Sequence, residues 1–108
     1  METINYDHFA KLNIRIGTVI EAEKIENTDK LMKLLVNFGD EKRTIVSGIA
    51  EWYSPEDLVG KQVPVLINLE PRKLKGVESQ GMILAADEDG KAILLNPIKK
   101  IPDGTPVY

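Results

Sequence analysis

Three cations occupy four consecutive positions of one short segment, residues 71–76. Arg72, Lys73 and Lys75 are the cations, and the amide of Asn68 lies just before them. Lysine and arginine side chains neutralise phosphates, so this segment could bind a nucleic-acid backbone. A solvated turn is the other interpretation, because short basic runs are common and weakly specific.

A hydroxyl, an amide and a thioether follow these cations along the chain. Ser79 and Gln80 supply hydrogen-bonding groups, and Gly81 permits a close approach of another molecule. Met82 has a flexible side chain that could lie against a nucleobase, although it could equally belong to the hydrophobic core. These residues stand at the entrance to a strand that we expect at residues 81–86.

Catalytic and metal-binding chemistry have little support in the sequence. His8 is the single histidine and cysteine is absent, so we expect no zinc site and no thiolate chemistry. Residues 76–81 have the GxxxxG spacing of a phosphate loop, but Met82 and Ile83 replace its lysine and its serine or threonine. No serine or threonine accompanies a histidine and an acid at a recognisable spacing. We therefore expect no catalytic residue, no cofactor and no metal ion.

The composition indicates a small globular protein without a bulk attraction for nucleic acid. The 108 residues suit one domain, and the net charge of -3 means that any RNA binding must come from a local basic patch. The apolar runs are too short to span a membrane, and no signal segment or disulfide framework is visible. We expect a cytoplasmic protein.

Alternating apolar residues predict an all-β architecture with two short helices. Asn5 or Asp7 would cap a helix at residues 6–12, and Ser54 would cap a helix that begins at Pro55. We place a β-bulge at Gly17, in the middle of the first strand. Five strands with a helix between the third and fourth fit the five-stranded Greek-key OB-fold barrel. The expected strands cover residues 13–22, 32–38, 44–46, 63–69 and 81–86.

The last 22 residues are expected to form an extension of the barrel. Asp89 and Gly90 predict a hairpin turn, and several large apolar residues follow it. These side chains exceed what a small barrel can bury, so we expect the extension and the N-terminal arm (residues 6–12) to cover one another or to pair two copies of the chain. We therefore predict one domain over residues 1–108, with the barrel at about 9–86 and a dimerisation extension at 87–108. The apolar residues are Ile93, Leu94, Leu95, Ile98 and Ile101.

Residues 68–82 closely resemble the signature of a tRNA-binding domain family. The family occurs at the C-terminus of many methionyl-tRNA synthetases and as free-standing tRNA-binding proteins. Residues 9–17, 27–31 and 43–49 resemble the same family in the same order. The resemblance covers Phe9 to about Ala86, and the OB-fold that it implies agrees with the strand pattern.

The resemblance implies a tRNA-binding module without a catalytic site of its own. Its partners would be tRNA, read by shape, a second copy of the chain, and the catalytic chain of a methionyl-tRNA synthetase. The chain would then be the beta subunit or the appended C-terminal domain of that synthetase. The family motif puts Asn68, Arg72, Lys73, Ser79 and Met82 at the RNA surface, flanked by Lys30 and Lys33, while Lys75 belongs to the basic segment. For Lys30 and Lys33, an ordinary solvated strand edge is nearly as good an explanation.

The aromatic content favours recognition of folded RNA over stacking on single strands. The chain has three tyrosines, two phenylalanines and one tryptophan, and Phe38 alone lies well inside a predicted strand. Contacts with phosphates and shape suit A-form helices. The net acidity keeps a second hypothesis open, in which the barrel is a protein-interaction module that docks to a synthetase or translation factor. A general single-strand binder is the third hypothesis.

Overall fold

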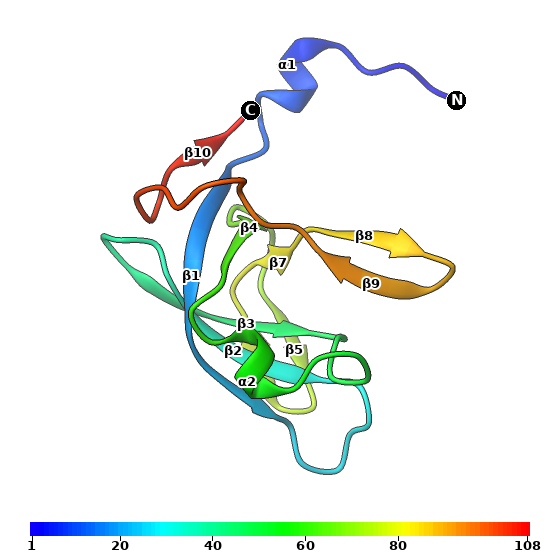
Figure 1. Ribbon diagram of the computed structural model, residues 1–108. Coiled ribbons are helices and arrows are strands. Elements are labelled where there is room, and N and C mark those ends of the chain that lie inside the picture. The colour runs from blue at the N-terminus through cyan, green and yellow to red at the C-terminus, as the bar shows by residue number, and fades with distance from the viewer.

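A nearly closed barrel of antiparallel strands forms the centre of the computed structural model, which describes residues 1–108 (Figure 1). Two short helices, two hairpins and a short terminal strand complete the chain. The fold is mostly β and OB-like, so the predicted fold class is confirmed. The barrel strands are β1 (Ile14–Lys24), β2 (Met32–Asn37), β3 (Lys42–Ser47), β4 (Gln62–Leu66) and β7 (Met82–Ile83), paired in the order β3-β2-β1-β4-β7. The other elements are α1 (Tyr6–Phe9), α2 (Pro55–Leu58), β5 (Arg72–Leu74), β6 (Val77–Ser79), β8 (Ala85–Glu88), β9 (Lys91–Leu94) and β10 (Pro106–Val107).

The core lies inside the barrel and follows the alternation of the sequence. Along β2, Met32, Leu34 and Val36 are buried and the residues between them are half-buried. All five residues of β4 are buried, which explains why its sequence is nearly continuously apolar. Leu58 of α2 is 1% exposed and joins this core. The short helix therefore covers one opening of the barrel.

The long strand β1 bends around the barrel, but its irregularity is not at Gly17. The register against β2 shifts between Val19 and Glu21, whereas Gly17 pairs regularly with Val63 of β4. A Cβ atom at Gly17 would lie 2.6 Å from Cγ1 of Val36. The bulge prediction was wrong because this glycine makes room for core side chains and does not break the ladder.

Both helices begin at the predicted caps. The side chain of Asn5 accepts a hydrogen bond from the His8 amide at 2.9 Å. At α2, the Asp57 carboxylate accepts from the Ser54 amide at 2.9 Å and from the Ser54 hydroxyl at 3.0 Å. These bonds stabilise the ionised carboxylate, so they lower the pKa of Asp57, the backbone donor having the larger effect.

One carboxylate in the C-terminal residues accepts hydrogen bonds from three strands of the barrel. Asp103 Oδ1 accepts from Thr18 Oγ1 at 2.6 Å and from Gln62 Nε2 at 3.1 Å, and its Oδ2 accepts from Asn37 Nδ2 at 3.5 Å. The donors come from β1, β4 and β2, and β10 then pairs with the start of β1. We call these four side chains the Asp103 hub.

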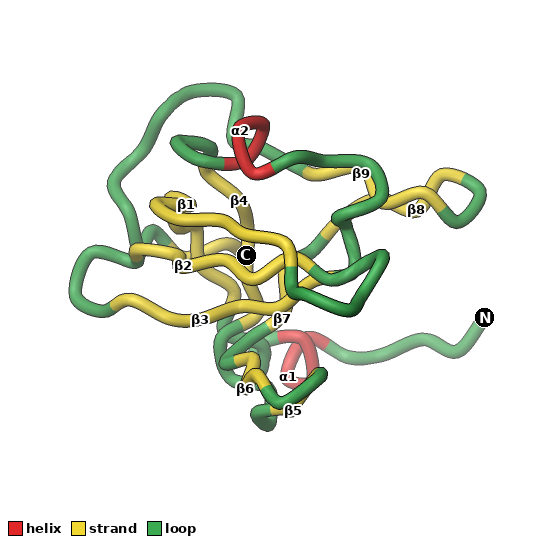
Figure 2. The backbone as a smooth tube through the Cα atoms, turned by 90° about the horizontal axis from the view of Figure 1, so that it is seen from below, coloured by secondary structure: helices red, strands yellow, loops and turns green.

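Two hairpins extend from the barrel at different places. Figure 2 shows the β5–β6 hairpin on the side opposite α2, while β8 and β9 project sideways in both views. The hairpin predicted at Asp89 and Gly90 joins β8 to β9 and is confirmed. The β5–β6 hairpin was not expected, and it lies between β4 and the fifth barrel strand, β7. That fifth strand is shorter than predicted. No helix of the structure has the length and apolar character needed to cross a membrane.

Candidate nucleic-acid interface

The predicted basic segment is a β-hairpin, which we call the basic hairpin (residues 72–79). Its register places Arg72 opposite Ser79 and Lys73 opposite Glu78. At the tip, Lys75 has φ of 52° and the following glycine has φ of 80°. Two successive left-handed residues define the tight turn that matches the twist of paired strands. The structure thus brings Arg72, Lys73 and Lys75 together on one exposed hairpin.

The three cations of the basic hairpin have no acidic partner within salt-bridge distance. The ion pairs in the structure join Lys33 to Glu23 and Arg43 to Glu41. Glu78 stands opposite Lys73 in the ladder without forming such a pair. The positive charge of the hairpin is therefore available to an anionic ligand.

Two hollows flank the basic hairpin. The first, of about 50 Å³, lies beneath Arg72 and Leu74 and reaches Leu69 and Met82. The second is an open groove of about 380 Å³ between the hairpin tip and the β2–β3 face, and Lys33 and Gln80 form part of its wall. An RNA backbone that follows the hairpin would have apolar and polar side chains within reach on either side.

Met82 lies at the surface and not in the core. Its side chain is 45% exposed, and Leu69 beside it is 40% exposed. The interpretation of Met82 as barrel core is therefore excluded. An exposed thioether next to a free guanidinium offers an apolar contact for a nucleobase or sugar.

Asn68 lies at the surface, but both ends of its amide already bond the N-terminal segment. Its Oδ1 accepts from the Asn13 amide at 2.8 Å, and its Nδ2 donates to the Lys11 carbonyl at 2.7 Å. In this conformation the side chain holds the segment that leads into β1 against the end of β4.

Ser79, which the family motif puts at the RNA surface, is buried and 5% exposed. Its hydroxyl accepts from the Val46 amide at 2.9 Å and donates to the Gly81 carbonyl at 2.9 Å. Successive side chains of a strand point to opposite faces, so Glu78 of β6 faces solvent and Ser79 faces β3. Ser79 closes the barrel and has no free polar atom to offer a ligand.

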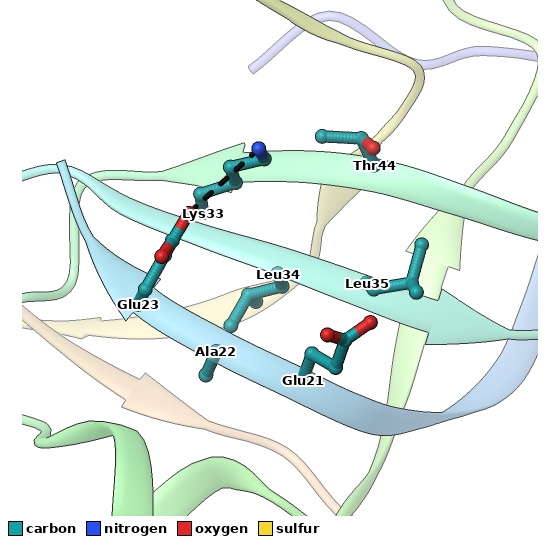
Figure 3. A pocket seen from close by; sticks show the side chains of 7 residues that line it. All are labelled: Glu21, Ala22, Glu23, Lys33, Leu34, Leu35 and Thr44. Atoms are coloured by element: carbon teal, nitrogen blue, oxygen red, sulfur yellow. Dashed lines mark ion pairs between the residues drawn. The ribbon is translucent and has the colours of Figure 1, made fainter.

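Lys33 borders two different grooves. In the groove shown in Figure 3, the Lys33 ammonium lies 3.7 Å from Glu23, and Glu21 adds a second carboxylate. That groove is acidic and unsuited to phosphate. On its other side Lys33 joins the open groove of the basic hairpin. Lys30 is exposed in the turn before β2 and lines neither hollow of the basic hairpin.

Arg43 was absent from the predicted set, and Gln80 was noted only as a hydrogen-bonding group, although both take part in the bonds between β3 and the root of the basic hairpin. Arg43 Nη1 donates to the carbonyls of Ile67 at 2.6 Å and of Gln80 at 3.1 Å. Arg43 also donates to the Glu41 carboxylate, and this hydrogen bond lowers the pKa of Glu41. One weak signal in the sequence is that Arg43 begins residues 43–49, one of the stretches that resemble the family.

The structure offers no aromatic platform on the barrel strands. Phe38, the aromatic residue expected within a strand, is 2% exposed and packs in the core. The sole aromatic pair is Tyr6 with Phe9, in the N-terminal helix. Extended single strands usually bind OB-folds by stacking on exposed rings. The site therefore suits a phosphate backbone better than a row of bases. No group of three histidine or acidic side chains is arranged to hold a metal ion.

Comparison with known proteins identifies the class of domain. The family described as "Putative tRNA binding domain" matches residues 14–106. A methionine–tRNA ligase of Archaeoglobus fulgidus is 58% identical over 106 residues, which are 98% of this chain and 16% of that protein. The chain thus spans about one sixth of the length of this curated relative. It belongs to the tRNA-binding domain family.

Solved structures place the chain more narrowly. A MetRS-related protein of Pyrococcus horikoshii has a TM-score of 0.95 at 48% identity and covers 100% of both chains. The chaperone CsaA of Bacillus anthracis has a TM-score of 0.91 at 32% identity, over 99% of this chain and 100% of that one. The chain is thus homologous both to the tRNA-binding domain of methionyl-tRNA synthetases and to CsaA-type chaperones.

Proposed function

We propose that this chain is a non-catalytic tRNA-binding module that reads the shape and backbone of folded tRNA. It acts as one domain over residues 1–108, in the cytoplasm, and raises the tRNA affinity of a methionyl-tRNA synthetase. It does so as the beta subunit or as the appended C-terminal domain of that enzyme, whose catalytic chain supplies aminoacylation.

The unpaired charge of the basic hairpin carries this proposal. Arg72, Lys73 and Lys75 lie on one protruding element in a chain of net charge -3, without an acidic partner. A local cationic patch on an acidic molecule favours binding in one orientation. If Lys33 exchanges its ion pair with Glu23 for a phosphate and acts as a fourth cation, about four phosphates would be neutralised. The logarithm of affinity should then fall with a slope of roughly three to four against the logarithm of salt concentration.

Equilibrium binding of the purified chain to labelled tRNA tests the proposal. Joint Arg72→Ala and Lys73→Ala should weaken binding about 60-fold at 0.1 M salt, since each lost phosphate contact removes about 0.9 from the slope. Joint Lys24→Ala and Lys61→Ala removes two exposed cations that lie near the carboxylates of α2 and is the matched control. The hypothesis fails if binding is insensitive to salt or survives the loss of Arg72 and Lys73.

Comparison of ligands separates shape recognition from single-strand binding. Folded tRNA should bind more tightly than the same RNA held unfolded by heat, and more tightly than a DNA oligomer of equal length. Equal affinity for all three would favour the general single-strand binder. The burial of Phe38 supports the first outcome, because it leaves no ring on the barrel for stacking.

We further propose that two copies associate through residues 87–108 and the N-terminal arm. Ile98 and Tyr108 are 107% and 91% exposed, and Tyr6 and Leu12 line a hollow of about 410 Å³ with the C-terminal strand. Two basic hairpins in one particle would raise affinity through effective concentration. Sedimentation at micromolar concentration should give a dimer; a monomer would refute this part of the proposal.

The second candidate function is a protein-interaction module with secondary RNA contact. The exposed apolar side chains of the N-terminal arm and C-terminal extension favour it, as does the similarity to proteins described as chaperones. The barrel would then dock to a synthetase or translation factor through these apolar residues. Under this hypothesis, joint Leu95→Ser and Ile98→Ser would abolish binding to the synthetase or translation factor. Joint Arg72→Ala and Lys73→Ala would leave that binding intact.

A further inference from the structure

We infer that Arg43 is a positioning residue for the tRNA site: it fixes the basic hairpin on the barrel and does not touch RNA. This inference rests on the proposed function, because it states how the proposed binding element is held. Arg43 would act through the shape of its guanidinium group and not through its charge.

The contacts of Arg43 span the two ends of the hairpin segment. Its Nη1 donates to the Ile67 carbonyl, which precedes β5, and to the Gln80 carbonyl, which follows β6, at 2.6 and 3.1 Å. Its Nε donates to Glu41. The side chain is 25% exposed. One guanidinium thus ties the entry and the exit of residues 68–79 to β3.

Further hydrogen bonds join β3 to residues 79 and 80, and we call them the seam. Most of them involve a side chain. One backbone bond crosses it, from the Gln80 amide to the Thr44 carbonyl at 2.8 Å. The Thr44 amide donates to Gln80 Oε1 at 3.0 Å, and the Val46 amide donates to the Ser79 hydroxyl. These two amides are two residues apart and therefore lie on the same edge of β3.

A hairpin with three-residue strands cannot hold its own position. Isolated two-stranded hairpins are marginally stable in water, so the direction of the basic hairpin depends on its ties to the barrel. Arginine suits the task, because its planar fork donates several hydrogen bonds in fixed directions, whereas the lysine ammonium is a point charge on a flexible chain. A phosphate contact would tolerate lysine. In Arg43, Nε bonds Glu41 while Nη1 bonds both carbonyls, and a single lysine nitrogen cannot occupy these two positions at once.

The substitution Arg43→Lys tests the inference because it keeps the charge and removes the fork. We expect tRNA affinity to fall at least tenfold at 0.1 M salt, with a shallower salt slope. Amide hydrogen exchange should become faster at Leu74 and Val77 while β2 and β4 keep their protection. Arg15→Lys is the control for an arginine outside the clamp, since Arg15 lies on β1 and donates to Asn13 at 3.3 Å but bonds neither the Ile67 nor the Gln80 carbonyl.

Two results with the Arg43→Lys variant would overturn the inference while leaving the proposed function intact. One is wild-type affinity in Arg43→Lys; the other is weaker binding with unchanged exchange in the hairpin, which would mean that Arg43 contacts RNA directly. If the variant does not fold, the side-chain NMR signals of the unmodified chain decide the matter. Addition of tRNA should then shift the Nε signal of Arg72 and leave that of Arg43 in place. A shift at Arg43 also overturns it, whereas an unmodified chain that fails to bind tRNA refutes the proposed function itself.

Discussion

The two hairpins of this molecule have the same backbone turn and opposite charge. Lys75 and Asp89, at φ of 52° and 51°, are each followed by a glycine with positive φ. The basic hairpin has Arg72, Lys73 and Lys75, whereas the β8–β9 hairpin, here called the acidic hairpin, has Asp87, Glu88 and Asp89. Turn geometry therefore does not distinguish the hairpin that we propose to bind tRNA from one of opposite charge.

The hairpins also differ in how they join the barrel. Arg43 and the seam fix the basic hairpin at both ends. The acidic hairpin is held along β9, where Leu94 packs against the core and its amide donates to the Tyr53 hydroxyl at 3.1 Å. All residues of β8 are exposed. Polar side chains thus orient the basic hairpin, while apolar packing holds the acidic one.

Removal of all three cations from the basic hairpin should have the largest effect. The triple variant Arg72→Ala, Lys73→Ala and Lys75→Ala should bind tRNA about 500-fold more weakly at 0.1 M salt, because three phosphate contacts are lost. Fluorescence anisotropy measures the change. The matched control removes three exposed lysines outside both the basic hairpin and residues 87–108, and a similar loss there would mean that charge acts without regard to place. Its substitutions are Lys24→Ala, Lys42→Ala and Lys61→Ala.

Loss of the Ser79 hydroxyl should destabilise the protein more than the equivalent change at the acidic hairpin. Ser79→Ala leaves the buried Val46 amide without its partner and should lower the free energy of unfolding by about 1–3 kcal/mol. Tyr53→Phe removes the acceptor of the half-buried Leu94 amide and should cost about 1 kcal/mol or less. Urea unfolding measures both. Equal costs would contradict the view that the seam is the more tightly closed junction.

The substitution Lys75→Asn should separate binding from stability. Asparagine tolerates the left-handed conformation better than lysine, so the free energy of unfolding should stay constant or rise by up to about 1 kcal/mol. The lost cation should reduce tRNA affinity about eightfold at 0.1 M salt. Asp89→Asn places the same residue in the same turn of the acidic hairpin and is the control. If both variants bind alike, Lys75 does not contact phosphate.

Neutralisation of the acidic hairpin should have the smallest effect. Joint Glu88→Gln and Asp89→Asn should raise tRNA affinity less than about twofold, because salt at 0.1 M screens charges that lie more than about 10 Å apart. Binding measured at 0.05 and 0.2 M salt reveals the difference. A rise of tenfold or more would show that the acidic hairpin lies close to the bound RNA and controls its orientation.

The barrel was largely predictable because buried apolar residues alternate with more exposed residues along its strands. Met32, Leu34 and Val36 alternate with half-buried residues, and Asn5 and Ser54 mark the starts of helices. The basic hairpin was not predicted as a hairpin, since its strands are short and mostly exposed and have no apolar alternation. Its turn also begins with lysine, which rarely adopts positive φ.

In the candidate site, the cluster of charges was predictable from the sequence and the contacts of the polar side chains were not. The cluster of Arg72, Lys73 and Lys75 is local in sequence, so spacing alone could identify it. The hydrogen bonds of Arg43 reach carbonyls 24 and 37 residues away, and that of Ser79 reaches an amide 33 residues away. Such bonds depend on the closed barrel and leave no pattern along the chain. For that reason Ser79 was placed at the surface and Arg43 was overlooked.

The Asp103 hub constrains the order in which the chain becomes native. Its partners lie 85, 66 and 41 positions earlier, so the hub cannot form until the first 103 residues are available. Closing such long loops costs entropy before any contact repays it, which makes this a late step in folding. During synthesis on the ribosome, β1, β2 and β4 would therefore assemble before their polar side chains acquire this shared acceptor. The newly formed barrel would at first lack the hydrogen bonds to Asp103.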